Sequence, residues 1–320
     1  MKKIIIYTVI LFMLMYPLLV GFSNYYLTIF FMMSVYVITA LGLNLLLGFG
    51  GQVSVGQAGF LMVGAYSVAI LSSKVGLPFI VTLPLAGIIT GIVGLIIGLS
   101  AARLKGHFLA VVTLGFGISV PQIILNWQGL TGGYSGMSVA KPTFIFGIHF
   151  YYVVVLITLF IIFIIYNLVN SSLGRAFIAI RDSEVAAQSM GINVPLYKLL
   201  MFVISSFFTG VAGGLYAYWF SFVSPNDFTL ATSFLILAMV VVGGLASIPG
   251  AIIGAMVLSL IPHYTDQFVG LTNLIIGVLM VFIILVRPNG LASIKKMSFK
   301  NLTFGKKVGN KGVIKDAEIG

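Results

Sequence analysis

The segment "GRAFIAIRDSEVAAQSMGINVPLYK", residues 174–198, interrupts an otherwise apolar chain and decides how the fold is interpreted. The 173 residues before it contain no aspartate or glutamate, whereas the segment holds two acids, two arginines and a lysine. Ser183 suits a helix N-cap, Glu184 favours the positive end of a helix, and Gly191 suits its left-handed C-terminal residue. These signals predict a helix of about two turns over 185–190, fixed at both ends. Because a helix this short does not persist alone in water, it must dock on its own bundle or on a partner.

The composition around this segment is that of an integral membrane protein. Of the 320 residues, 60% are hydrophobic and 7% are charged, and the mean hydropathy is +1.18. A soluble domain carries about 25% charged residues. The chain has no cysteine, which excludes disulfides, thiolate chemistry and cysteine-ligated metals. The formal charge of +11 indicates basic cytoplasmic segments rather than nucleic-acid binding.

Apolar runs predict an all-α polytopic membrane protein. A helix needs about 20 apolar residues to cross a bilayer, so we expect about ten transmembrane helices, in a range of roughly eight to ten because three runs are short. The expected spans are Ile4–Phe22, Tyr25–Leu47, Gln57–Ser72, Pro78–Ala102, Phe108–Leu125, Phe150–Val169, Leu199–Phe222, Phe228–Val242, Ala251–Ile261 and Val269–Val286.

Lysine and arginine set the expected orientation. With these spans, fifteen of the 17 basic residues fall on one side, and only Lys74 and Lys141 fall on the other. The basic side of a membrane protein is the cytoplasmic one. Both termini are therefore expected in the cytoplasm, and the chain is expected to be a multi-pass protein of the cell (plasma) membrane.

Two parts follow from this topology. Residues 1–291 form the expected transmembrane domain, which includes a cytoplasmic loop over residues 170–198. Residues 292–320 form a lysine-rich cytoplasmic tail that we expect to be disordered. Within it, Lys295 and Lys296 are placed to contact anionic lipid headgroups.

Charge is missing from the expected spans, and this limits the mechanism. Proton-coupled carriers keep ionisable groups inside the membrane, where each costs roughly 2.5–3.5 kcal/mol. The six acids and three histidines of this chain lie outside the spans or at their ends. No nucleophile with its base and no metal-ligand set can be assembled, so neither an enzyme nor a metal site is expected. Sodium coupling through backbone carbonyls remains open.

Two glycine-rich stretches, "GGQVSVG" (50–56) and "GGLASIPG" (243–250), interrupt apolar helices. Paired interruptions of this kind point to a substrate path, because unwound backbone is tolerated in a membrane only where protein buries it or water lines it. Tight packing through small residues explains them equally well, and the runs Gly87–Gly98 and Gly210–Gly214 favour packing. The candidates for lining a path are Asn44, Gly50, Gly51, Gln52, Ser54, Gly56, Gln57, Gly243, Gly244, Ser247, Pro249 and Gly250. Such a path suits a neutral or zwitterionic solute with an apolar body.

Several motifs together resemble the permeases of branched-chain amino acid ABC importers of the LivM type. They are "LGLNLLLGFGGQVSVGQAGF" (41–60), "RLKGHFLAVVTLGFG" (103–117), "TGGYSG" (131–136), "GRAFIAIRDSEVAAQSMGINVPLYKLLMFVISSFFTGVAGGLYA" (174–217), "VVVGGLASIPGAIIGA" (240–255) and "RPNGL" (287–291). The cytoplasmic loop is similar to the family's pattern of two alanines, three variable residues, glycine and isoleucine. The acid that begins this pattern falls at position 185, where this chain has Val185 beside Glu184.

The resemblance implies one half of a permease without its own ATPase site. It would pair with a LivH-type permease, two cytoplasmic ABC ATPases and an extracytoplasmic solute-binding protein. The chain itself would bind no cofactor, since ATP and magnesium belong to the ATPase subunits, and it has no GxxxxGK[ST] motif. The helix that couples it to the ATPases would comprise Arg175, Arg181, Asp182, Ser183, Glu184, Ala186, Ala187, Gly191 and Ile192.

The function expected from the resemblance is ATP-driven uptake of leucine, isoleucine and valine. Similar permeases move urea or short amides, which makes these the second choice of solute. From the residues alone, a passive channel for small neutral solutes and a structural membrane scaffold remain alternatives. An ordinary amphipathic loop helix is likewise an alternative to a coupling helix over residues 185–190.

Overall fold

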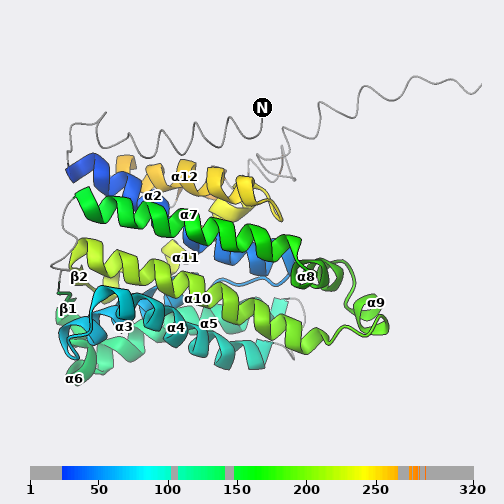
Figure 1. Ribbon diagram of the computed structural model, residues 1–320, viewed down its shortest axis with the longest axis horizontal. Helices are drawn as coiled ribbons and strands as arrows, with labels where there is room; N and C mark the ends of the chain where they lie inside the picture. Colours follow the sequence, from blue (N-terminus) through cyan, green and yellow to red (C-terminus); the bar gives the residue numbers. More distant parts are fainter. Residues whose placement is uncertain are drawn as a thin grey trace, which may run out of the picture.

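The computed structural model describes residues 24–101, 107–140 and 148–265, together with single helical positions between 274 and 285. In this part the chain is a bundle of helices that run along one common direction (Figure 1). The elements are α2 (Asn24–Asn44), the π-helix η1 (Leu45–Phe49), α3 (Gln57–Ser73), α4 (Phe79–Ala101), α5 (His107–Asn126), α6 (Gln128–Thr131), the 3-10 helix η2 (Gly133–Ser135), β1 (Met137–Ser138), α7 (Ile148–Asn170), α8 (Ser172–Asp182), α9 (Glu184–Ser189), α10 (Val194–Phe220), β2 (Phe222–Val223), the 3-10 helix η3 (Pro225–Asp227), α11 (Leu230–Gly243) and α12 (Ile248–Thr265).

The described helices agree with most of the expected spans. Six are long and apolar enough to cross a membrane, and two more, Gln57–Ser73 and Ile248–His263, are apolar but shorter. Together they coincide with eight of the expected spans. The expected span Ile4–Phe22 and the tail 292–320 lie outside the described residues, as does Val269–Val286 apart from single helical positions.

Helix α10 lies in the middle of the bundle in Figure 1 and packs against both α3 and α4, which also contact each other. Small residues allow this close approach, as the glycine runs predicted. A side chain at Gly94 would collide with Ser206 of α10, and one at Gly213 would collide with the Leu61 carbonyl of α3. Apolar side chains of α2, α11 and α12 complete the same core.

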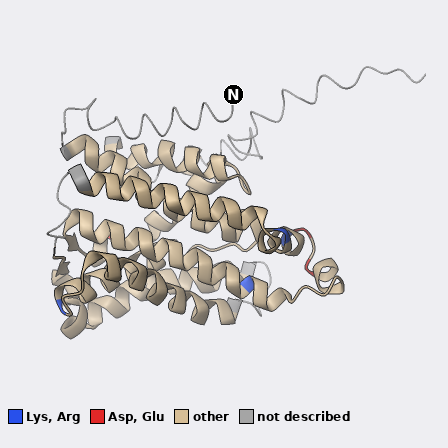
Figure 2. Cartoon of the chain, viewed as in Figure 1, with Lys and Arg blue, Asp and Glu red and all other residues tan. Residues whose placement is uncertain are grey.

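The bundle has two different ends. At the β1 end, two-residue strands β1 and β2 pair antiparallel with Met137 opposite Val223, a small exception to the all-α expectation. Lys74 donates to the Gly129 carbonyl at 2.7 Å at this end. Helices α8 and α9 project at the opposite end, which we call the α9 end (Figure 1). Figure 2 shows charged residues toward the two ends and uncharged ribbon over most of the length between them.

Candidate coupling and translocation site

The short capped helix predicted over residues 185–190 is present as α9, Glu184–Ser189, one residue earlier than expected. The Ser183 hydroxyl accepts a hydrogen bond from the Ala186 N–H at 3.3 Å, which makes Ser183 the N-cap as predicted. Gly191 has φ of 82°, the left-handed conformation expected where the helix ends. Both predicted ends of α9 are therefore confirmed.

Helix α8, Ser172–Asp182, precedes α9, and no separate helix was expected there. Its buried residues are Gly174, Ala176, Phe177 and Ile180, a spacing of three and four residues that marks one apolar face. Ile180 packs against Ala187 of α9 and Val194 of α10. This cluster joins α8, α9 and the start of α10 into one packed piece. The apolar spacing in the sequence was the signal that could have revealed α8.

Charged side chains of this piece form contacts within the chain itself. Lys198 on α10 is only 5% exposed, and its ammonium group pairs with the Glu184 carboxylate at 2.5 Å. Glu184 therefore faces α10 and does not stand free for a partner. Its neighbour Val185 is 74% exposed and Met190 is 80% exposed, so the outer surface of α9 carries two large apolar side chains beside the exposed polar residues Gln188 and Ser189. Of the expected coupling residues, Ala187 is buried, whereas Ala186 and Gly191 are exposed.

Arg181, at the end of α8, reaches the first glycine-rich stretch. Its guanidinium donates to the Gly48 carbonyl at 3.0 Å and to Asp182 at 2.9 and 3.1 Å. A side chain at Gly51 would lie 2.9 Å from Arg181 Cγ, so the lack of one permits the approach. Helix α8 is therefore in direct contact with the backbone at the point where the helix formed by α2 and η1 is interrupted.

The interruption begins with a π-helix. In η1, Leu45–Phe49, the N–H of Gly50 bonds the Leu45 carbonyl five residues back at 3.1 Å. Single π turns inside α-helices are frequent at functional sites. The chain then runs without regular structure over residues 51–56, with Gly51 at φ of 67°. This geometry frees the Gly48 carbonyl that Arg181 binds.

Asn44 joins the two glycine-rich stretches. Its side-chain amide donates to the Ser247 carbonyl at 3.1 Å and accepts from the Ala246 N–H at 3.1 Å. A side chain at Gly48 would collide with both Asn44 and Ala246. The end of α2 and η1, which lead into the first stretch, are thus bound to the second stretch through one amide.

The candidate path residues of the two stretches differ in their surroundings. Gln52 is 4% exposed, and its Oε1 atom has no hydrogen-bond partner among the described residues, as is also true of the buried Ser54 hydroxyl. Gln57, by contrast, is bonded to Ser205 at 3.3 Å and to Thr209 at 3.0 Å. Unpaired buried polar groups are uncommon, which favours the first stretch for a role beyond packing.

The second stretch is better explained by packing and capping. A side chain at Gly243 would collide with the Gly250 carbonyl. The Ser247 hydroxyl accepts from the Gly250 N–H at 3.1 Å. Pro249 and Gly250 were expected inside the interruption, but α12 begins at Ile248 and includes them in its first turn. Proline is tolerated there because its missing N–H has no helical acceptor.

A cavity of about 250 Å³ lies where α8, α9 and the start of α10 meet the first glycine-rich stretch. It is lined by Gly50, Gly51, Gln52, Leu109, Ile180, Arg181, Asp182, Ser183, Glu184 and Lys198. Residues of both predicted sites therefore share one cavity at the α9 end. Within the described ranges, no three histidine, aspartate or glutamate side chains are grouped to hold a metal ion.

Fold and site together define a multi-span membrane protein in which interrupted helices contact a helical segment outside the spans. The chain belongs to the family described as branched-chain amino acid transport system / permease component, whose model matches residues 25–284. It is 36% identical over 299 residues to the high-affinity branched-chain amino acid transport system permease protein LivM of Salmonella typhimurium, covering 84% of this chain and 70% of that protein.

Two further relatives extend the comparison. LivM of Escherichia coli is 36% identical over 296 residues, which cover 83% of this chain and 69% of that protein. A probable LivH permease of Methanocaldococcus jannaschii is 28% identical over 293 residues, which cover 83% of this chain and 91% of that protein. No solved structure matches the chain. Both permease types of this transport system are therefore similar to the present sequence.

The Asn44 contact gives a stability prediction. Asn44→Ala should lower the free energy of unfolding by about 1–3 kcal/mol, because partly buried backbone groups of Ala246 and Ser247 lose their partner. Thr39→Val on the same helix is the control, since the Thr39 hydroxyl donates only to the Val35 carbonyl of its own helix. Denaturant unfolding of the purified protein in detergent measures both. Equal destabilisation by the two substitutions would contradict a joining role for Asn44.

Proposed function

We propose that this chain is a transmembrane subunit of an ATP-driven importer for branched-chain amino acids. The observation that carries the proposal is the piece formed by α8 and α9, which is capped at both ends of α9 and exposes the large apolar side chains of Val185 and Met190. Its partners would be a LivH-type permease, two ABC ATPases that bind ATP and magnesium, and an extracytoplasmic solute-binding protein. The α9 end would then face the cytoplasm and the β1 end the outside.

The distribution of charge supports an external energy source. In the described membrane helices, no aspartate, glutamate, lysine or arginine lies away from the ends, since Lys198 is the fifth residue of α10 and pairs with Glu184 at the α9 end. A proton relay through the membrane needs further ionisable groups. The described spans supply none, so the work of transport would come from the ATPase subunits.

The contacts of α8 and α9 suggest how a movement of the ATPase subunits would be transmitted to the membrane helices. ATP would close the ATPase pair, and α9 would move with it through an apolar contact at Val185 and Met190. Helix α8 would follow because Ile180, Ala187 and Val194 pack together. The displacement would reach the interrupted helix through the Arg181–Gly48 bond and α10 through the Lys198–Glu184 pair.

The solute class follows from the path residues and from the relatives. The first stretch offers the amide of Gln52 and the hydroxyl of Ser54, and the cavity beside Gln52 also holds Arg181, Asp182, Glu184 and Lys198. This chemistry suits a zwitterion with an apolar side chain. The relatives named LivM carry branched-chain amino acid transport in their names, which favours leucine, isoleucine and valine over urea or short amides.

Uptake by the reconstituted importer tests the function. The chain, the second permease, both ATPases and the binding protein in liposomes should accumulate labelled leucine only with ATP. Isoleucine and valine should compete, whereas urea and acetamide should not. Competition by urea alone would instead favour the amide alternative, and equilibration of leucine without ATP would favour a passive channel.

Gly191 provides the test of the coupling segment. Gly191→Val should abolish most leucine uptake and solute-stimulated ATP hydrolysis, because a β-branched residue is strained at the positive φ of 82°. Gly191→Asn is the matched control, since asparagine tolerates this conformation and nothing lies within 4 Å of the added side-chain atom. Both variants should insert and co-purify normally. Full uptake by Gly191→Val would refute the coupling role of α9.

A further inference from the structure

The half of α5 toward the β1 end exposes polar residues where a lipid-facing helix should be apolar, whereas Phe108 and Val111 on the same face of its other half are apolar. The exposed residues Gly115, Ser119, Gln122 and Asn126 recur every three or four positions and so lie on one side of the helix. The side chains of Ser119 and Gln122 form no hydrogen bond with any described residue, and the Asn126 amide donates to the backbone carbonyl of Gln122 at 2.8 Å. Polar side chains within a span usually find partners inside the protein. This face is therefore incomplete in the single chain.

The other peripheral helices make the contrast clear. The exposed side chains in the middle of α4 are aliphatic, such as Ile92 and Ile96, and those of α7 are Leu156, Phe160 and Phe163. These surfaces match lipid. Only 28% of the most apolar stretch of α5, and of that of α7, is buried within the chain, so both helices are peripheral, but α5 exposes Ser119, Gln122 and Asn126 beside apolar residues such as Ile118 and Ile123. Lipid alone does not explain the α5 face.

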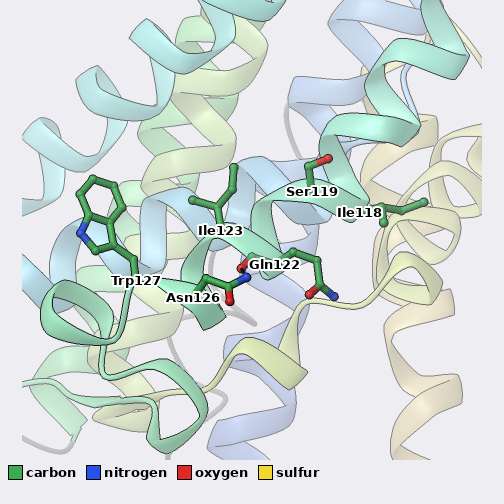
Figure 3. A pocket seen from close by; sticks show the side chains of 6 residues that line it. All are labelled: Ile118, Ser119, Gln122, Ile123, Asn126 and Trp127. Carbon is green, nitrogen blue, oxygen red and sulfur yellow. Dashed lines mark hydrogen bonds between the residues drawn. The ribbon is translucent and has the colours of Figure 1, made fainter.

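An open hollow of about 610 Å³ lies along this face, lined by Ile118, Ser119, Gln122, Ile123, Asn126 and Trp127 (Figure 3). Asn126 ends α5 at the β1 end, close to Gly129 and its Lys74 contact. Ser119 lies about 10 Å deeper, since a helix rises 1.5 Å per residue. With Asn126 at the boundary of a bilayer core of about 30 Å, that depth is about two thirds of the way to its middle. The polar groups thus lead from the β1 end into the membrane.

The opposite face of α5 packs on the first glycine-rich stretch. The Thr113 hydroxyl accepts from the Val55 N–H at 3.1 Å. A side chain at Gly56 would collide with the Thr113 carbonyl, and one at Gly117 would lie 3.3 Å from Gly56. The stretch that Arg181 holds at its beginning therefore contacts α5 at its other end. A displacement of this stretch would therefore change its contacts with α5 and could move that helix.

We propose that the α5 face is one wall of a water-filled solute path that the related second permease closes from the other side. Ser119, Gln122 and Asn126 would bind the charged groups of a zwitterionic amino acid. Ile118, Ile123 and Trp127 would contact its apolar side chain. The inference rests on the proposed importer. The similarity of this chain to a LivH permease supports a partner that presents an equivalent helix.

Cysteine labelling tests the proposal, because the chain has no cysteine of its own. Ser119→Cys and Gln122→Cys are compared with Ile92→Cys on α4 and Leu156→Cys on α7 in the assembled importer in membranes. A thiol reacts as its thiolate, which water favours, so a membrane-impermeant methanethiosulfonate should modify the α5 cysteines at least about tenfold faster than the controls. Leucine with binding protein should slow the reaction at the α5 cysteines only. The unsubstituted chain gives the background from the partner subunits.

Failure of this inference can be told apart from failure of the proposed function. If the α5 cysteines react as slowly as the controls while ATP-driven uptake is intact, the path is elsewhere and the inference is wrong. If they react rapidly but no ATP-dependent uptake occurs, the importer proposal fails and a channel along α5 remains.

Gln122→Leu, with Gln122→Asn as the conservative variant, provides a second test that does not depend on labelling. A path residue predicts a raised KM for uptake, partial recovery with asparagine, and unchanged co-purification of the second permease. A dry subunit contact predicts altered co-purification with unchanged KM, and this result would overturn the inference.

Discussion

Backbone that leaves the helix inside a membrane must find its hydrogen bonds within the protein, because lipid offers none. In this chain that requirement is met at one place by a small set of contacts. The π-helix η1 redirects the backbone, Asn44 binds the second stretch, and Arg181 binds the carbonyl of Gly48. The interruption is thereby held by a residue outside the membrane helices. This contact makes the arrangement of the interrupted helix depend on the position of α8.

The charged side chains of residues 174–198 form unexpected contacts within the chain. Its arginine and acids suggest an electrostatic contact with a partner, but Arg181 binds the backbone and Glu184 pairs with Lys198. What remains exposed is mixed, because Val185 and Met190 are large and apolar whereas Asp182, Gln188 and Ser189 are polar. In the proposed contact with an ATPase, Val185 would stand where the resemblance led us to expect an acid. In the proposed complex, the charges would transmit movement and the apolar residues would bind the ATPase.

Much of the fold could be predicted from local patterns. Apolar run length placed the described spans, and Ser183 and Gly191 placed α9, because caps are read from single residues. The Arg181–Gly48 bond could not be foreseen, since no sequence signal marks a carbonyl freed by a π turn. Which side chains of α5 are exposed could not be predicted from the sequence either. A glutamine on a membrane helix reveals its role only when the packing shows that it faces outward.

Spin-label distances in the assembled importer test most directly whether the cytoplasmic segment and the interrupted helix move as one. Labels at Val185→Cys on α9 and Val53→Cys in the first stretch are placed in the cysteine-free chain, with Ile96→Cys on α4 as the reference. Binding of ATP should leave the distance between positions 185 and 53 unchanged and should shift the distance between positions 53 and 96. If the first distance changes while the second stays fixed, α9 moves without the interrupted helix, and the connection through Arg181 does not operate.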